Sequence, residues 1–452
     1  MKATKNKSFV STRNACKLCS PLGACMVFRG IEGGLPLLHG SQGCATYVRR
    51  YIISHFREPM DVASSNFSES TAVFGGKDNL TTALDNVIKQ YHPKFIGVAT
   101  TCLSETIGEN VPHLLRDYLR ERTGRPMPAL VHASTPSYAG SHMEGFHAAV
   151  KATVDTLADG GDKIRRVNLF PGFLSPADLR HLKEILEDFN LPFTLFPDYS
   201  ETLDAPTWDR YRLLPDGGTT MEDLKGMGAN FASIEFGRTL KGRPTGAESL
   251  RTRFGVTRTT LGTPIGVDET DLFFQLLEVL SGRPVPEKYV QERGRLIDSF
   301  FDAHKYVFEK RAIVYGEEDL VVGLASFLAS VGIVPVLCAS GGESGRLEEC
   351  IREVCPQMAS KITVKEGVDF ADIEQEAVSA SPDLFIGNSK GYPISRKLNV
   401  PFVRVGFPLH DSLGGQRVLH IGYQGAQGLF DSIVNAVLRH KQDVSTAGYA
   451  YM

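Results

Sequence analysis

The chain has 452 residues, too many for one hydrophobic core, and its length favours two to four domains. Hydrophobic residues make up 42% and charged residues 22%, as in an ordinary soluble globular protein. The net charge of −3 gives no reason to expect nucleic acid or an anionic membrane as a partner. No apolar run is long enough to cross a membrane, and the basic start lacks the apolar segment of a signal peptide. We therefore expect a cytoplasmic protein, with residues 1–14 as a mobile arm.

Eight cysteines are distributed unevenly, at positions 16, 19, 25, 44, 102, 338, 350 and 355. Five lie in the first 102 residues and three near the C-terminus. In a long chain without a secretion signal, disulfides are the poorer explanation for such cysteines. Cys16 and Cys19 form a C-x-x-C pair, which alone is a weak redox motif, and no second ligand pair at zinc-finger spacing follows.

The N-terminal part is organised around one strand–turn–helix segment. An apolar strand over residues 35–38 leads into a glycine-broken turn, and residues 45–56 are predicted to form a helix. Cys44 then stands at a helix N-terminus, where backbone N–H groups and the helix dipole favour the metal-binding thiolate. Gly40 and Gly43 let the backbone approach whatever the thiolate holds. The alternative is a buried free cysteine in a strand–helix connection.

Two more cysteines occupy comparable positions. Pro21 fits the first turn of a predicted helix that residues 23–31 continue, so Cys19 stands just before this helix. Cys102 follows a predicted buried parallel strand over residues 94–99. Open α/β sheets bind their ligands at the carboxyl ends of the strands. We therefore expect the thiols to gather at one edge of a sheet.

Later segments add a serine and an aromatic residue to this picture. A strand over residues 129–132 is expected to bring Ser137 to the same edge, and Phe74 lies in a predicted exposed loop over residues 70–76. Thiolates hold iron–sulfur clusters, and three cysteines are one short of the usual four ligands. A side-chain oxygen or another subunit would have to complete such a site. The alternative is three unrelated core or loop cysteines.

The remainder of the chain repeats the alternation of strands and helices. We predict an α/β fold of three doubly wound, Rossmann-like domains with mainly parallel sheets, over residues 1–158, 159–308 and 309–452. Residues 285–308 are predicted to form one long helix, and residues 428–441 the last helix. The glycine-rich turns of the third domain lack nucleotide-binding spacing. Cys350 and Cys355 fall on a predicted helix and are expected to be packing or surface residues.

Eight short segments of this sequence form a recognisable set, in a fixed order. They are HGSQGC, SHFREP, AVFGG, TTCLSE, TPSYAGSH, GFPLHD and LGGQR followed by GYQGAQ. The set resembles the β-type subunits of the nitrogenase component 1 superfamily, over nearly the whole chain. That resemblance implies three Rossmann-like domains and an α2β2 heterotetramer with a homologous α-type subunit.

The resemblance also implies roles for individual residues. Cys19, Cys44 and Cys102 match the cysteines that bind half of an eight-iron P-cluster shared with the α-type subunit. Ser137 matches a serine that can join the cluster. Tyr47 matches a tyrosine beside it, and Gly43 belongs to the same motif as Cys44. Phe74 matches a phenylalanine at which the ATP-dependent iron protein docks.

The expected function is therefore an electron relay within a nitrogenase-like oxidoreductase complex. In that reading the cluster passes electrons from the iron protein to a cofactor held by the α-type subunit. A second reading is a NifN-type scaffold for iron–molybdenum cofactor biosynthesis, with a four-iron cluster. The absence of a long N-terminal extension favours the scaffold, whereas the three retained cysteines and the serine favour the relay. A third reading is a non-redox interaction protein with structural cysteines.

Overall fold

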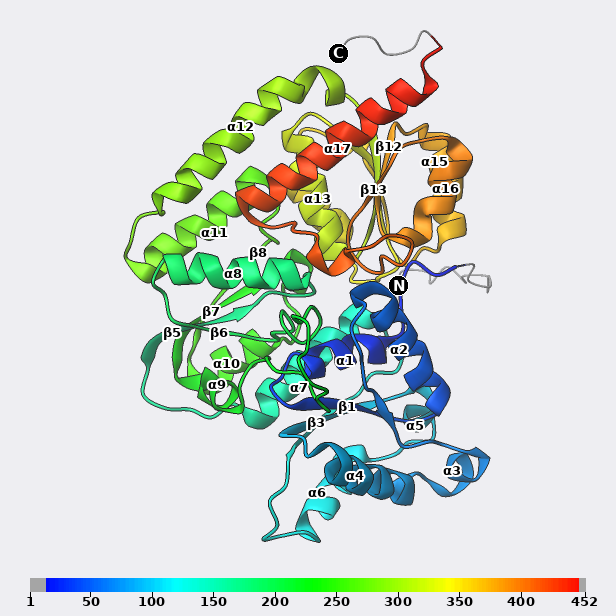
Figure 1. The fold of residues 1–452 in the computed structure, drawn as a ribbon, viewed down its shortest axis with the longest axis vertical. Helices are drawn as coiled ribbons and strands as arrows, with labels where there is room; N and C mark the ends of the chain where they lie inside the picture. Colours follow the sequence, from blue (N-terminus) through cyan, green and yellow to red (C-terminus); the bar gives the residue numbers. More distant parts are fainter. Residues whose placement is uncertain (1–13, 447–452) are drawn as a thin grey trace, which may run out of the picture.

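The structure is a computed structural model, and it describes residues 14–446. Three parallel sheets form the framework (Figure 1). The N-terminal sheet contains β1 (Gly34–His39), β2 (Ala63–Ser64), β3 (Phe95–Thr100) and β4 (Ala129–Ala133). The middle sheet contains β5 (Ile164–Phe170), β6 (Phe193–Leu195), β7 (Asn230–Phe236) and β8 (Thr257–Leu261). The C-terminal sheet contains β9 (Arg311–Gly316), β10 (Val334–Ser340), β11 (Thr363–Lys365), β12 (Leu384–Gly387) and β13 (Phe402–Arg404).

The strand orders confirm the predicted doubly wound α/β fold. They are β2-β1-β3-β4, β6-β5-β7-β8 and β11-β10-β9-β12-β13, and every pair is parallel. In each sheet the chain builds outward from the first strand to one side and then continues on the other side. The three sheets lie inside the three predicted ranges; the domain limits at 158 and 308 stay predictions.

Helices cover both faces of the N-terminal sheet. They are α1 (Ser20–Arg29), α2 (Gln42–Phe56), α3 (Glu69–Phe74), α4 (Lys77–Tyr91), α5 (Cys102–Thr106), α6 (Val111–Arg120) and α7 (His142–Leu157). Every residue of α1 is buried, and α1 and α7 belong to the large core on one face. Leu84 of α4 and Leu115 of α6 pack with Leu37 and Val98 on the other face.

The remaining helices accompany the middle and C-terminal sheets. They are α8 (Pro176–Asp188), α9 (Met221–Gly226), α10 (Gly246–Phe254), α11 (Gly266–Ser281), α12 (Glu287–Val307), α13 (Glu318–Ser330), α14 (Leu347–Val354), α15 (Phe370–Ala380), α16 (Tyr392–Leu398) and α17 (Gly422–Val444). Short 3₁₀ helices are η1 (Met227–Ala229), η2 (Arg238–Leu240), η3 (Ala359–Lys361), η4 (Ser389–Gly391) and η5 (Gly415–Arg417). Phe430 of α17 contacts Phe300 of α12 at 4.9 Å between ring centroids, so the last helix returns to the middle part (Figure 1).

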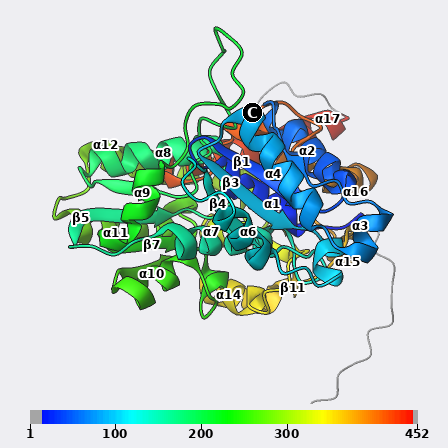
Figure 2. The ribbon, with the colours of Figure 1, turned by 90° about the horizontal axis from the view of Figure 1, so that it is seen from below.

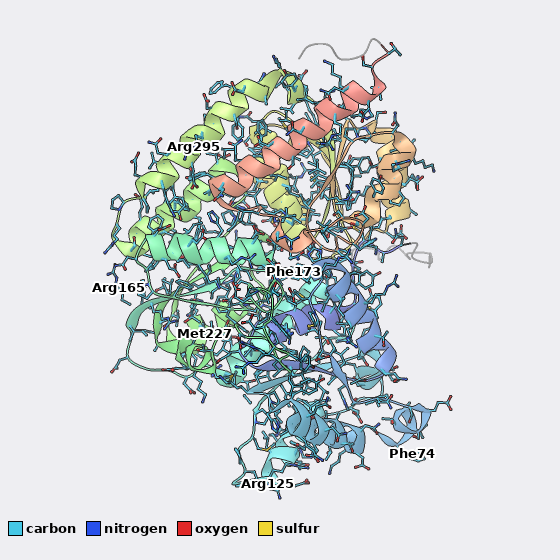
Figure 3. All side chains as sticks on the ribbon, viewed as in Figure 1. Phe74, Arg125, Arg165, Phe173, Met227 and Arg295 are labelled. Atoms are coloured by element: carbon cyan, nitrogen blue, oxygen red, sulfur yellow. The ribbon has the colours of Figure 1, made fainter. Side chains whose placement is uncertain are left out.

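The predicted loop over residues 70–76 is wrong for the most part, because residues 70–74 belong to helix α3. Ser68 caps α3 by accepting a hydrogen bond from the Thr71 N–H, and Gly75 ends the helix at φ 91°. Both views place α3 at the margin of the N-terminal part (Figures 1 and 2). Phe74 at its end points away from the molecule (Figure 3) and is 88% exposed, as predicted.

Most predicted helices and strands are confirmed with shifted ends. Helix α2 begins at Gln42, with Ser41 as its N-cap, three residues before the predicted start. Helix α17 begins six residues earlier than predicted, at Gly422. Residues 1–13 of the predicted arm and residues 447–452 lie outside the described part. Within residues 14–446, no helix combines the length and the apolarity needed to cross a membrane.

Candidate metal centre

The two central strands of the N-terminal sheet end side by side, and a cysteine follows each. β1 and β3 pair in parallel, with His39 opposite Thr100 at their carboxyl ends. The order in which the strands are added to the sheet reverses between β1 and β3. Open α/β sheets form their ligand-binding crevice at this switch point. Cys44 is the third residue of α2, and Cys102 is the first residue of α5. The structure therefore places both thiols at the predicted edge.

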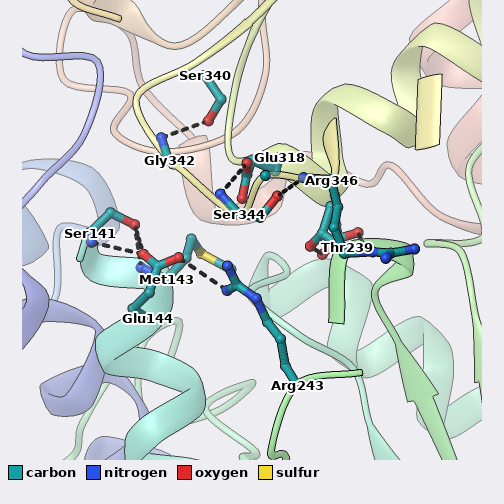
Figure 4. A network of polar contacts seen from close by, with 12 residues as sticks. Ser141, Met143, Glu144, Thr239, Arg243, Glu318, Ser340, Gly342, Ser344 and Arg346 are labelled. Carbon is teal, nitrogen blue, oxygen red and sulfur yellow. Dashed lines mark hydrogen bonds and ion pairs between the residues drawn. The ribbon is translucent and has the colours of Figure 1, made fainter. Parts of the chain in front are cut away.

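The third cysteine reaches this edge from α1. Cys19 is the N-cap residue of α1 and forms an isolated antiparallel bridge with Ser141, the N-cap residue of α7. Glu144 accepts hydrogen bonds from the Ser141 N–H and hydroxyl at 2.8 and 2.6 Å, and it pairs with Arg243 of the middle part at 3.3 Å (Figure 4). The backbone at Cys19 is therefore fixed to a capped helix.

Cys19, Cys44 and Cys102 lie close enough to influence one another. All three are free and half-buried. Burial raises the pKa of the Cys44 thiol, and the Cys19 and Cys102 thiols raise this pKa further, because neighbouring thiolates disfavour another negative charge. A bound metal would reverse this balance, since a coordinating thiol loses its proton.

Among the described residues, the three thiols do not form a ligand set for a single metal ion. Within residues 14–446, no group of three or more histidine, cysteine, aspartate or glutamate side chains is arranged to hold one metal ion. A structural zinc ion needs four ligands that converge on one point. A cluster of several irons spreads its thiolates over different metal atoms, so it fits a more open set of cysteines.

Ser137 lies between Cys102 and the start of α1. Its N–H donates to the Cys102 Sγ at 3.2 Å, and its hydroxyl accepts from the Ser20 N–H at 3.1 Å. The hydroxyl thus satisfies the first N–H of α1, which has no partner within the helix. The Ser137 hydroxyl therefore makes a contact between residues 117 positions apart in the sequence.

Tyr47 follows Cys44 by one turn of α2 and faces Cys19. Burial raises the pKa of the Tyr47 hydroxyl, and the Cys19 thiol is the next cause. Gly43 precedes Cys44, and a Cβ added there would meet only the Ser41 Oγ, at 3.6 Å. Gly43 therefore leaves this side of the turn open.

Gly40 has a different role from the one predicted. A Cβ at Gly40 would lie 2.0 Å from the Thr101 Oγ1, so the two cysteine-bearing turns touch each other at this glycine. The C-x-x-C pair is also divided. Cys16 is buried with residues of the C-terminal sheet, and burial raises its pKa to about 12, whereas Cys19 faces the N-terminal edge.

Two apolar side chains beside the thiols remain exposed. Leu103 follows Cys102 and is 38% exposed, and Tyr138 follows Ser137 and is 68% exposed. Sequence patterns did not single them out, because isolated apolar residues in turns carry no periodic signal. A group of buried polar residues beneath the turns, centred on Glu109, was also missed, since its members are far apart in the sequence.

The fold and the site together define an α/β protein of three Rossmann-like domains with a thiol-bearing sheet edge. The model of the nitrogenase component 1 type oxidoreductase family matches residues 19–438, and the chain belongs to this family as a β-type member.

Relatives support this assignment over nearly full lengths. The nitrogenase molybdenum-iron protein beta chain of Clostridium pasteurianum is 38% identical over 430 residues, covering 94% of this chain and 93% of the relative. The nitrogenase vanadium-iron protein beta chain of Trichormus variabilis is 33% identical, with 98% of each chain covered. The solved structure of nitrogenase Cp1 at pH 6.5 superposes with a TM-score of 0.94 at 35% identity, covering 100% of this chain and 98% of the other.

Proposed function

We propose that this chain is the β-type subunit of a nitrogenase-like α2β2 oxidoreductase complex. Cys19, Cys44 and Cys102 hold its half of a P-cluster-type iron–sulfur cluster at the interface with a homologous α-type subunit. The observation that carries the proposal is the gathering of three free, half-buried thiols at the switch point of the N-terminal sheet.

The donor set fits such a cluster. Soft thiolates stabilise iron in more than one redox state, and a positively charged iron core offsets the mutual repulsion of the three sulfurs. Three ligands from one chain leave the set incomplete, so the α-type subunit supplies the rest. The exposed Leu103 and Tyr138 support a partner at this edge, because a covering subunit would bury them.

When bound, the cluster supplies reversible electron transfer. The residues of this chain hold and tune it: the Ser137 N–H donates to the Cys102 Sγ, and a hydrogen bond to a cluster sulfur shifts its reduction potential. Tyr47 packs beside Cys19 and against Tyr51, with ring centroids 4.8 Å apart, which limits water access to that thiol. Ser137 also brings a hydroxyl oxygen that suits an oxidised iron.

Phe74 is the proposed contact for the ATP-dependent iron protein. It is among the most exposed large apolar side chains of the described residues, and Val73 beside it is 75% exposed. An aromatic anchor on a protruding segment is typical of a docking site. Electrons arriving from the iron protein would then pass through the cluster to a cofactor in the α-type subunit.

The scaffold reading is less well supported. The nitrogenase molybdenum-iron protein beta chain of Clostridium pasteurianum aligns with this chain over 93% of its own length, which favours the nitrogenase-like role. The presence of Cys19, Cys44, Cys102 and Ser137 together supports the relay reading. The oxidoreductase family also argues against a non-redox interaction protein.

Anaerobic purification of this chain with its α-type subunit tests the proposal. We expect several irons per αβ pair, a cluster signal in electron paramagnetic resonance, and reduction of a small substrate that needs the iron protein and ATP. An iron-bearing complex that reduces no substrate under these conditions would favour the scaffold. A complex without iron would contradict both readings. Fractionation of the native cells tests the predicted cytoplasmic location.

A further inference from the structure

A series of hydrogen-bonded, mostly buried polar groups connects the segment of Phe74 to the two turns that carry Cys44 and Cys102. Its centre is Glu109, in the loop between α5 and α6, whose side chain is 8% exposed. One carboxylate oxygen of Glu109 accepts the Gly76 N–H, and the other contacts the Nε2 of His39. A single carboxylate thus joins the start of α4 to the end of β1.

His39 continues the series into the sheet edge. Its side chain is fully buried, and its Nδ1 lies 3.0 Å from the Ser65 Oγ, which also accepts the Gly40 N–H at 3.0 Å. The Phe67 ring packs edge-on against the imidazole with centroids 4.7 Å apart. If the Ser65 hydroxyl donates to the His39 Nδ1 and the His39 Nε2–H donates to Glu109, every polar side-chain atom of these three residues has a hydrogen-bond partner.

Both cysteine-bearing turns are attached to this residue. The Thr101 N–H donates to the His39 carbonyl at 3.2 Å, and Thr101 immediately precedes Cys102. Gly40, the next residue after His39, begins the turn to Cys44 and touches Thr101. A displacement of His39 would therefore move the backbone on the Cys44 side and on the Cys102 side together.

The outer end is equally constrained. Gly76 lies two residues after Phe74, and a Cβ there would meet the Phe67 ring at 2.5 Å and a Glu109 oxygen at 3.0 Å. Gly75, between them, has φ 91°, where a side chain would strain the backbone. The connection from Phe74 to Gly76 is thus short and sterically restricted, so Phe74 can move little without moving the Gly76 N–H that Glu109 accepts.

We propose that Glu109 is a positioning residue that couples the docking segment at Phe74 to the turns carrying Cys44 and Cys102. The inference rests on the proposed function, since it assumes docking at Phe74 and a cluster on these cysteines. Contact at Phe74 shifts Gly76; Glu109 and His39 pass the shift to the turns, and the surroundings of the bound thiolates change. Buried hydrogen-bonded chains transmit such shifts because their packed members have no free space to absorb them.

The test compares Glu109→Ala and Glu109→Gln with Asp85→Asn in the αβ complex. Asp85 is a matched control, because this carboxylate also ties two helices of the same part, through Tyr118 at 2.7 Å and Arg122 at 3.0 Å, without contacting the cysteine turns. For each variant we would measure iron content, the iron-protein concentration at half-maximal rate, the maximal rate of electron transfer and the cluster potential.

For Glu109→Ala we expect unchanged iron content and an unchanged half-saturating concentration, with a maximal rate lowered about 2- to 30-fold and a shifted potential. Glu109→Gln retains the side-chain length but presents an NH₂ group toward one of its two N–H partners, so we expect a smaller change in the same direction. Asp85→Asn should match the wild type in all four measurements. If Glu109→Ala loses iron, Glu109→Gln decides the question.

A double-variant cycle with Phe74→Ala separates coupling from independent damage. If docking at Phe74 acts through Glu109, Phe74→Ala lowers the maximal rate as well as the affinity for the iron protein. The two substitutions together then lower the maximal rate by less than the product of their separate effects. The inference is overturned if the Glu109 variant that retains its iron has the wild-type rate and potential. It is also overturned if the effects of the Phe74 and Glu109 substitutions on the maximal rate are fully multiplicative. The proposed function fails separately, if Cys44→Ala keeps its full iron content.

Discussion

The N-terminal and C-terminal sheets use the same alternation of strand, turn and helix, but among the described residues only the N-terminal sheet has cysteines just beyond its strand ends. In the N-terminal part, Cys44 and Cys102 follow strand ends and remain half-buried. In the C-terminal part, Cys338 lies inside β10 and Cys350 inside α14, both with almost no exposed surface. Burial raises the pKa of Cys338 far above its usual range, and that of Cys350 to about 11.

This difference shows that position along a strand, more than the number of cysteines, decides whether thiols are available for chemistry. Thiols at the carboxyl edge share a site and affect one another, as the pKa of Cys44 shows. Thiols within a strand or on the inner face of a helix behave as small apolar residues. The predictions below test this contrast, beginning with the largest effect.

Thiol reactivity should separate the two regions most strongly. In the isolated chain without metal, we expect iodoacetamide to label Cys19, Cys44 and Cys102 at least about a hundredfold faster than Cys338, Cys350 and Cys355, because labelling of buried thiols requires local or global opening. The labelling rate of Cys44 should increase as the pH rises toward its raised pKa. Mass spectrometry of the labelled peptides gives both rates. Comparable labelling of the two sets would contradict the contrast.

Removal of the Phe74 ring should weaken docking without removing iron. We expect Phe74→Ala to weaken binding of the iron protein by about 1–2 kcal/mol or more and thereby to slow electron transfer. The iron content should stay unchanged. Val279, which is 80% exposed on α11, provides a control, and Val279→Ala should have no effect. Rates measured over a range of iron-protein concentrations check the result. An unchanged rate at limiting iron protein would count against Phe74 as a docking residue.

In the C-terminal region, the buried Glu318 should make the folding stability depend on pH. Burial is the main cause that raises the pKa of Glu318 to about 7, while a hydrogen bond from the Ser344 N–H at 3.1 Å lowers it (Figure 4). Because the folded protein binds this proton more tightly than the unfolded chain, protonated Glu318 contributes to folding stability. This contribution is complete below the unfolded pKa of 4.5 and is lost as the pH rises through about 7. Glu318→Gln should therefore be more stable than the wild type at pH ~8, by about 1–2 kcal/mol.

Thermal unfolding at several pH values between about 4.5 and 8 measures this effect. Glu348→Gln is the control, since the Glu348 side chain is 63% exposed and pairs with Arg352 at the surface. The two variants should differ most at the alkaline end. Parallel pH profiles for the wild type and Glu318→Gln would rule out the assigned protonation of Glu318.

Ser137 should have the smallest effect. We expect Ser137→Ala to leave the iron content unchanged and to shift only the potential of the most oxidised couple, because a serine oxygen binds iron best when the iron is oxidised. The variant also removes the acceptor of the Ser20 N–H, so unfolding should be measured in parallel. Anaerobic redox titration followed by electron paramagnetic resonance is the measurement. Titrations that superpose on the wild type would remove Ser137 as a ligand and strengthen the scaffold reading.

The sequence predicted the sheet edge well because each signal there is local. A short apolar strand, a glycine-containing turn and a helix start fix the positions of Cys44 and Cys102 without information from the rest of the chain. Cys19 was placed before a helix for the same reason, with Pro21 in the first turn. That the three thiols influence one another follows from the doubly wound topology, which a strand–helix alternation already implies.

Contacts between distant segments could not be predicted in this way. Ser137 bonds to Ser20 across 117 positions, and Glu109 contacts His39 across 70. Their geometry depends on how α1 and the loop after α5 pack against the sheet, which no local pattern encodes. Helix α3 was missed because it is only six residues long and is followed by two glycines, which by themselves indicate a loop. Strand β9 and helix α13 also had no counterpart among the predicted elements.

The central claim is that the edge cysteines, and not the buried ones, hold the iron. The most direct test is to count iron in αβ complexes carrying Cys44→Ala or Cys350→Ala, purified anaerobically side by side. We predict that Cys44→Ala loses iron and its cluster signal in electron paramagnetic resonance, whereas Cys350→Ala retains both. Equal iron content in the wild type and Cys44→Ala would contradict the claim.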